Sequence, residues 1–112
     1  MATKPLNPIQ ITRDYVKNLK DKIRVEKTIL FGSSARDEMN QDSDLDIIII
    51  SPDFKKMKYI DRLILLSKAR GNQFTFIPMD ILGYTNEEFE KMAKESVVLG
   101  EAQKEGKEIS FK

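Results

Sequence analysis

Apolar and polar positions in the first half of the chain predict one helix followed by two buried strands. Apolar residues recur at helical spacing over residues 12–23, with Thr12 as the N-terminal cap. These apolar positions are Tyr15, Val16, Leu19 and Ile23. Two apolar runs, 28–31 and 45–50, then predict strands. The second run does not alternate with polar residues as a half-exposed strand would, so we expect it in the middle of a sheet with both faces covered.

The next part of the chain predicts a second helix and a third strand. Residues 56–70 carry apolar side chains at helical spacing, and Gly71 supplies a C-terminal stop. Those side chains are Tyr59, Ile60, Leu63 and Leu66. Residues 75–82 predict a strand. Pro78 indicates an edge or bulged strand there, because proline cannot donate to the hydrogen-bond ladder.

The C-terminal segment begins with a helix-start pattern. Thr85 and Glu88 have the spacing of a capping box, so a helix starts there. The tail from Val97 predicts another helix, ended by Gly106 and followed by a short extended end. This order of elements favours an α/β (α+β) fold, a small mixed sheet of three to four strands flanked by helices. The length fits a single domain over residues 1–112.

Composition excludes several kinds of chemistry. The chain has no cysteine and no histidine, which excludes disulfides, thiolate or histidine metal sites, and serine–histidine triads. The net charge is only +1, so no global field favours nucleic acid or a membrane. The lysine clusters at 17–22 and 55–58 lack interleaved aromatic residues and are expected to be solvated. With no membrane-length apolar run and no signal-peptide core, the expected location is cytoplasmic.

Two aspartates at the start of the second predicted strand are the main chemical candidates. Asp44 and Asp46 stand at positions i and i+2, so their side chains would project from one face, about 7 Å apart along the strand. Their mutual repulsion, roughly 2 kcal/mol at an effective dielectric near 20, calls for a compensating cation. All-oxygen ligands favour Mg²⁺ or Mn²⁺. Asp80 could reach the same sheet face if its strand neighbours this one, and three carboxylates can hold two cations.

A second candidate lies between the first strand and a short helical turn expected at 35–39. Gly32, Ser33 and Ser34 would present free backbone N–H groups at a helix start, which is a site for anions. Arg36, one turn further, adds a planar cation suited to phosphate oxygens. A phosphate cradle and a metal-ligand pair would thus be separated by one short helix.

Simpler interpretations stay open for these residues. Asp44 and Asp46 could belong to a solvated turn, and Gly32 with the serines could form an ordinary strand-to-helix turn. Arg36 could pair with a nearby carboxylate, and Asp80 could mark a bend beside Pro78. A calcium loop would need glycine where Ile47 stands, so that interpretation fails.

The combined pattern resembles a known signature. Gly32-Ser33, Ala35-Arg36 and Ser43-Asp44-Leu45-Asp46 are similar to the signature of the DNA-polymerase-beta-like nucleotidyltransferase superfamily, in particular its minimal nucleotidyltransferases. Met79-Asp80-Ile81 and the segment 85–89 also resemble that branch, so the similarity covers nearly the whole chain.

This resemblance implies a function and roles for the matching residues. It implies transfer of a nucleoside monophosphate, adenylate from ATP, to a hydroxyl group by a mechanism with two Mg²⁺ ions. Gly32, Ser33, Ser34 and Arg36 would bind the nucleotide, Asp44 and Asp46 would bind both metals, and Asp80 would bind the acceptor-side metal and help to deprotonate the hydroxyl.

The resemblance also implies a partner and shows one departure. The implied partner is a separately encoded all-helical protein of the HEPN type, which the chain would adenylylate as an antitoxin. Asp37 stands where the family pattern usually has glycine, close to the phosphate cradle. The alternative is therefore a weakly active or inactive binding module that neutralises or scaffolds its partner, with Ile64 and Leu65 as a candidate interface.

Overall fold

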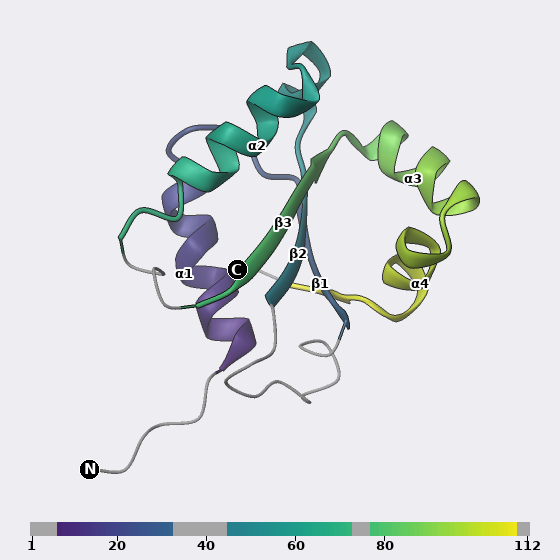
Figure 1. Ribbon diagram of the computed structural model, residues 1–112, viewed down its shortest axis with the longest axis horizontal. Coiled ribbons are helices and arrows are strands. Elements are labelled where there is room, and N and C mark those ends of the chain that lie inside the picture. The colour runs from purple at the N-terminus through teal and green to yellow at the C-terminus, as the bar shows by residue number, and fades with distance from the viewer. Residues whose placement is uncertain (1–6, 33–44, 73–76, 110–112) are drawn as a thin grey trace.

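The computed structural model describes residues 7–32, 45–72 and 77–109. Its helices are α1 (Pro8–Leu19), the 3-10 helix η2 (Pro52–Lys56), α2 (Tyr59–Lys68), α3 (Asn86–Glu95) and α4 (Val97–Glu105). Its strands are β1 (Lys27–Phe31), β2 (Leu45–Ile50), β3 (Met79–Tyr84) and β4 (Lys107–Glu108). The expected mixed α/β architecture is confirmed: one four-stranded sheet in the order β3-β2-β1-β4 separates α1 and α2 from α3 and α4 (Figure 1).

The strand β2 occupies the centre of the sheet, as its apolar run predicts. It pairs antiparallel with β1 and parallel with β3. Ile47 and Ile49 pack in the cluster that includes α1 and α2, whereas Ile48 and Ile50 pack in the cluster that includes α3 and α4. Burying each of these four isoleucines contributes about 1.5–3 kcal/mol, so both layers hold β2 in a fixed position.

The first helix begins earlier than its apolar pattern predicted. Asn7, not Thr12, is the N-cap, and its side-chain oxygen accepts from the backbone N–H groups of Ile9 and Gln10. Pro8 at the first helical position loses no needed donor, which favours this start. Thr12 instead lies buried inside the helix, where its hydroxyl donates to the carbonyl of Pro8 at 2.6 Å.

The second helix is shorter than predicted and buries a different face. The segment 56–70 contains the end of η2 and then α2, and the predicted apolar residues Tyr59 and Ile60 are 45% and 59% exposed. Leu66 is buried as predicted and Leu63 is half-buried, whereas Arg62 is buried in place of the two exposed residues. The apolar pattern missed this rotation because Arg62 packs in the interior despite its charge. Of the two residues proposed as an interface, Ile64 is exposed and Leu65 packs against the core.

The buried Arg62 joins four elements. Its guanidinium donates to the carbonyls of Phe54 at 2.6 Å and Gly83 at 3.3 Å, and to the carboxylate of Glu88 at 2.7 Å. Glu88 also accepts from the backbone N–H of Thr85 in the capping box that starts α3. The hydrogen bond from Arg62 holds the pKa of Glu88 below its ordinary value. One side chain thus ties η2 and α2 to β3 and α3.

The C-terminal part of the chain agrees with its sequence pattern. The capping box starts α3, Gly106 ends α4, and β4 pairs with β1. The third strand begins at Met79, later than expected, because Pro78 stands just before it. It is an edge strand, as the proline indicated. No helix in the described ranges is long and apolar enough to cross a membrane.

Candidate functional site

The sheet brings two of the predicted acidic residues side by side. In the parallel pair of β2 and β3, Asp46 lies directly opposite Asp80. Side chains that pair in this way on neighbouring strands project from the same face, with the strands about 4.8 Å apart. This is the face of Ile48, two residues after Asp46, and therefore the side of α3 and α4. Asp46 is half-buried and Asp80 is exposed.

The pair carries an electrostatic cost that a cation can offset. Two carboxylates about 5 Å apart repel each other by between about 1 kcal/mol in water and about 3 kcal/mol at an effective dielectric near 20. Their oxygen donors suit Mg²⁺. Within the described ranges, no group of three or more acidic residues is placed to hold a metal ion. Asp44, the predicted partner of Asp46, lies outside those ranges.

Gly32 lies next to Asp46 in the folded chain. It follows Phe31 of β1, which pairs with Asp46 across the antiparallel ladder. Its φ of +70° is in the left-handed region, and a Cβ atom built on it would come within 2.5 Å of the Asp46 Oδ2 atom. The backbone conformation favours glycine here, and any side chain would force the Asp46 carboxylate to move. Gly32 at the end of β1 and the acidic residue of β2 therefore form one structural unit.

The remaining predicted residues of the phosphate cradle cannot be placed in this way. Ser33, Ser34 and Arg36 of that cradle lie outside the described ranges, as does the helical turn expected at 35–39. The predicted metal ligand Asp44 and the departure at Asp37 also lie outside them.

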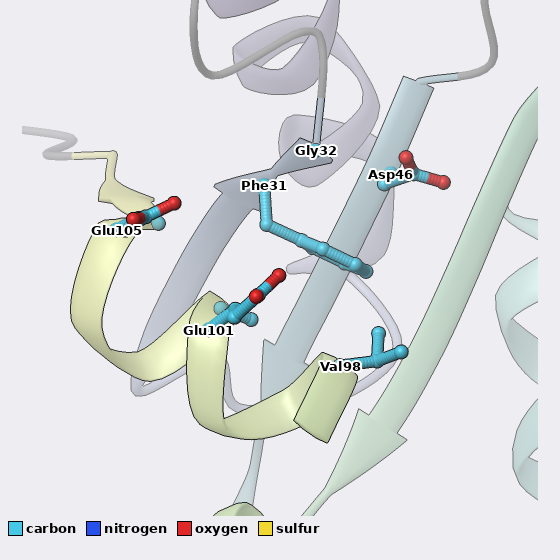
Figure 2. A pocket seen from close by; sticks show the side chains of 8 residues that line it. Phe31, Gly32, Asp46, Val98, Glu101 and Glu105 are labelled. Atoms are coloured by element: carbon cyan, nitrogen blue, oxygen red, sulfur yellow. The ribbon is translucent and has the colours of Figure 1, made fainter. Parts of the chain in front are cut away.

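A pocket of about 200 Å³ opens beside Asp46 on the α3 and α4 side. Figure 2 shows Asp46 and Phe31 on neighbouring strands, with Val98, Glu101 and Glu105 presented by α4. Glu101 and Glu105 stand one helical turn apart and are both exposed. This pocket combines a partly apolar wall with carboxylates from two distant parts of the chain.

The α4 residues were missing from the sequence-based site. Their i, i+4 spacing indicates a shared helix face, but nothing in the sequence relates that face to β2. The relation arises because α4 leads into β4, and β4 pairs with β1 beside the site. The long-range pairing of β4 with β1 thus places α4 residues at the site, and the local sequence pattern could not assign them to it.

Comparison with known proteins identifies the class of fold and the family. The nucleotidyltransferase domain model matches residues 12–109, so the chain belongs to that family. A crystal structure from Sulfolobus solfataricus, named as a nucleotidyltransferase, superposes with a TM-score of 0.54 over 81% of this chain and 85% of that chain. At 22% sequence identity, that likeness shows the shared fold alone.

Named relatives cover a shorter stretch. Two Methanocaldococcus jannaschii proteins that carry the name of protein adenylyltransferases are 48% and 45% identical to this chain over 40 residues. Each alignment covers 36% of this chain, and 40% and 41% of the respective relatives. The chain thus matches less than half of the length of these relatives. Membership of the nucleotidyltransferase family agrees with the resemblance of the aspartate and glycine motifs.

Proposed function

We propose that this protein transfers adenylate from ATP to a hydroxyl group of a protein acceptor, using two Mg²⁺ ions. The observation that carries the proposal is the register of the sheet, which sets Asp46 opposite Asp80 with Gly32 against Asp46. Family membership supports nucleotidyl transfer, and the names of the relatives support adenylate and a protein acceptor. The sequence resemblance favours a separately encoded all-helical HEPN-type protein as that acceptor, in an antitoxin role.

The proposed roles combine the positions of Asp46, Asp80 and Gly32 with the roles that the sequence resemblance implies. Asp46, with Asp44, would hold the Mg²⁺ ions, which supply positive charge for the phosphates. Asp80 would take the proton of the acceptor hydroxyl, whose oxygen then bonds to the α-phosphorus. The bond from the α-phosphorus to the bridging oxygen breaks, and pyrophosphate leaves. Gly32 would let the backbone approach the phosphates closely, because it has no side chain. A side chain at this position would also displace the Asp46 carboxylate.

The test is label transfer from ATP that carries ³²P at the α position, in the presence of Mg²⁺ and the protein encoded by the neighbouring gene. We expect Asp46→Asn to lower the transfer rate by more than about a hundredfold, since ligation of the metal stabilises the transition state by several kcal/mol. Asp21→Asn is the matched control: it removes the same charge from an exposed position that follows α1, on the other side of the sheet.

The outcome separates catalysis from the binding-module alternative. Transfer that is lost in Asp46→Asn and kept in Asp21→Asn supports the proposal. A stable complex with the neighbouring protein, without any transfer by the wild type, would establish the binding module in its place. Equal transfer by both variants would contradict the role of Asp46.

A further inference from the structure

The strand β3 has an open outer edge beside the proposed site. It stands at the end of the sheet order and pairs only with β2 among the described strands. In Figure 1, α2 lies beside one face of β3, and no coloured helix or strand runs along its outer side. An open edge presents backbone donors and acceptors to another chain.

The pairing with β2 fixes which backbone groups point outward. Leu45 donates to the carbonyl of Pro78 at 2.9 Å, and Ser51 donates to that of Tyr84 at 3.0 Å. Backbone groups of alternate residues in a strand point to opposite neighbours. Residues 78, 80, 82 and 84 therefore point their backbone groups toward β2. The groups that point outward belong to Ile77, Met79, Ile81 and Gly83.

Two arginine side chains bond to the first and the last of these outward-pointing residues. Arg70 donates to the carbonyl of Ile77 at 2.9 Å, and Arg62 donates to that of Gly83 at 3.3 Å. Between them, the backbone groups of Met79 and Ile81 point away from β2, and no other described strand pairs with β3 on that side. A groove of about 180 Å³ borders this stretch, lined on the α2 side by Leu63, Leu66, Ser67 and Arg70. The open stretch is short, defined at both ends and centred on Asp80.

We propose that an extended segment of the protein acceptor binds along this edge as an added strand, hydrogen-bonded to Met79 and Ile81. The inference rests on the proposed function and specifies how its acceptor is presented. A residue of the added strand that lies opposite Asp80 points to the same face, with its Cβ about 5 Å from that of Asp80. A hydroxyl at that position lies beside the Asp80 carboxylate, whose other neighbour is Asp46. Because recognition would use backbone groups, residues on either side of the modified residue in the acceptor could vary widely in type.

The test uses peptide acceptors and an edge variant. A nonapeptide library with serine, threonine or tyrosine fixed at the centre is incubated with Mg²⁺ and labelled ATP. Met79→Pro removes an outward N–H group without removing a bond to β2, and Met79→Leu is the matched control that keeps the N–H. We expect at least tenfold less peptide labelling by Met79→Pro, and wild-type labelling by Met79→Leu.

A second measurement uses the wild-type protein, so it does not depend on how the variant folds. Two further libraries carry N-methyl groups on alternate backbone amides near the central residue, one library for each of the two possible alternations. We expect one of these two libraries to be labelled at least tenfold less than the unmethylated parent library. Equal labelling of both methylated libraries and the parent library would overturn the proposal. So would labelling of folded proteins without labelling of any peptide, since an added strand does not require a folded acceptor.

Failure of the proposed function gives a different result. If the wild type labels no acceptor at all, adenylate transfer is contradicted, and the edge is tested by nuclear magnetic resonance of the ¹⁵N-labelled protein with the library. Shifts that peptide induces at the Met79 and Ile81 amides would support the interface. Shifts confined to other surfaces, or shifts at these amides that follow protein concentration because a second copy pairs there, would overturn it.

Discussion

At the scale of single residues, the site depends on two positions that leave almost no chemical freedom. Gly32 has a left-handed backbone conformation, and the Asp46 carboxylate lies where a side chain of residue 32 would begin. Asp46 is in turn held by β2, whose neighbouring residues Leu45 and Ile47 are fully buried. A change at Gly32 should therefore alter both stability and the position of Asp46.

Gly32→Ala tests this coupling, and Gly71→Ala is its matched control. Gly71 also has a left-handed backbone, with φ +58°, but an added Cβ there meets nothing within 4 Å. We expect Gly71→Ala to cost about 1 kcal/mol, from backbone strain alone. Gly32→Ala should cost about 1–2 kcal/mol more, and it should abolish the rise in melting temperature that we expect Mg²⁺ to give the wild type under the proposed function. Equal losses in the two variants, with the Mg²⁺ response intact, would contradict the coupling.

At the scale of secondary-structure elements, Arg62 connects the α2 layer to the start of α3. It is 5% exposed and bonds to three backbone carbonyls as well as to Glu88. A buried cation with a full set of acceptors stabilises the fold chiefly because its removal leaves those acceptors unsatisfied.

Arg62→Met should lower the free energy of unfolding by about 3 kcal/mol, because the apolar side chain fits but leaves buried carbonyls without donors. Arg24→Met, at an exposed position, is the control and should change stability little. Urea denaturation at pH 7 measures both. A loss below about 1 kcal/mol for Arg62→Met would show that water satisfies the same carbonyls.

The ionisation of Glu88, the partner of Arg62, makes the stability of the fold depend on pH. Because Arg62 lowers the pKa of Glu88 below its ordinary 4.5, the folded state favours the ionised carboxylate. This stabilisation is present above pH 4.5 and is lost as the pH falls through the lower pKa of the folded state. Urea denaturation from pH 7 to pH 3 should therefore show the stability of wild type falling toward that of Glu88→Gln in this acidic window. A constant difference across the range would contradict the assignment.

At the scale of the whole molecule, the pocket is assembled from two parts of the chain that lie far apart in the sequence. β1 and β2 contribute Phe31 and Asp46, and α4 contributes Glu101 and Glu105. The two glutamates add negative charge near the place proposed for an anionic nucleotide. The arrangement should weaken nucleotide binding through long-range repulsion.

Neutralising both α4 glutamates tests this effect. Glu101→Gln combined with Glu105→Gln should lower the KM for Mg-ATP a few-fold at low salt, since each removed charge acts through water by a few tenths of a kcal/mol. The difference should shrink at high ionic strength. Glu90→Gln combined with Glu95→Gln, both exposed on α3 and outside the pocket, is the control. A KM that rises in the pocket variant would indicate that the glutamates assist binding.

The sequence by itself determined most of the elements and the family to which the chain belongs. The apolar run of β2 specified a central strand because burial on both faces has a distinct pattern, and the capping box specified the start of α3. The motifs from Gly32 to Arg36 and from Ser43 to Asp46 carried the family resemblance, and the family comparison agrees with it. These features are local, so a linear pattern can encode them.

Only the tertiary structure decided which distant residues meet. The register of β2 and β3 set Asp46 opposite Asp80, the buried Arg62 rotated α2 away from its apolar pattern, and the return of β4 to β1 brought α4 to the pocket. Strand pairing and layer packing depend on contacts between segments far apart in the chain. No local periodicity records those contacts. Pro78 indicated that β3 is an edge strand, but only the folded molecule shows that this edge lies beside the pair of Asp46 and Asp80.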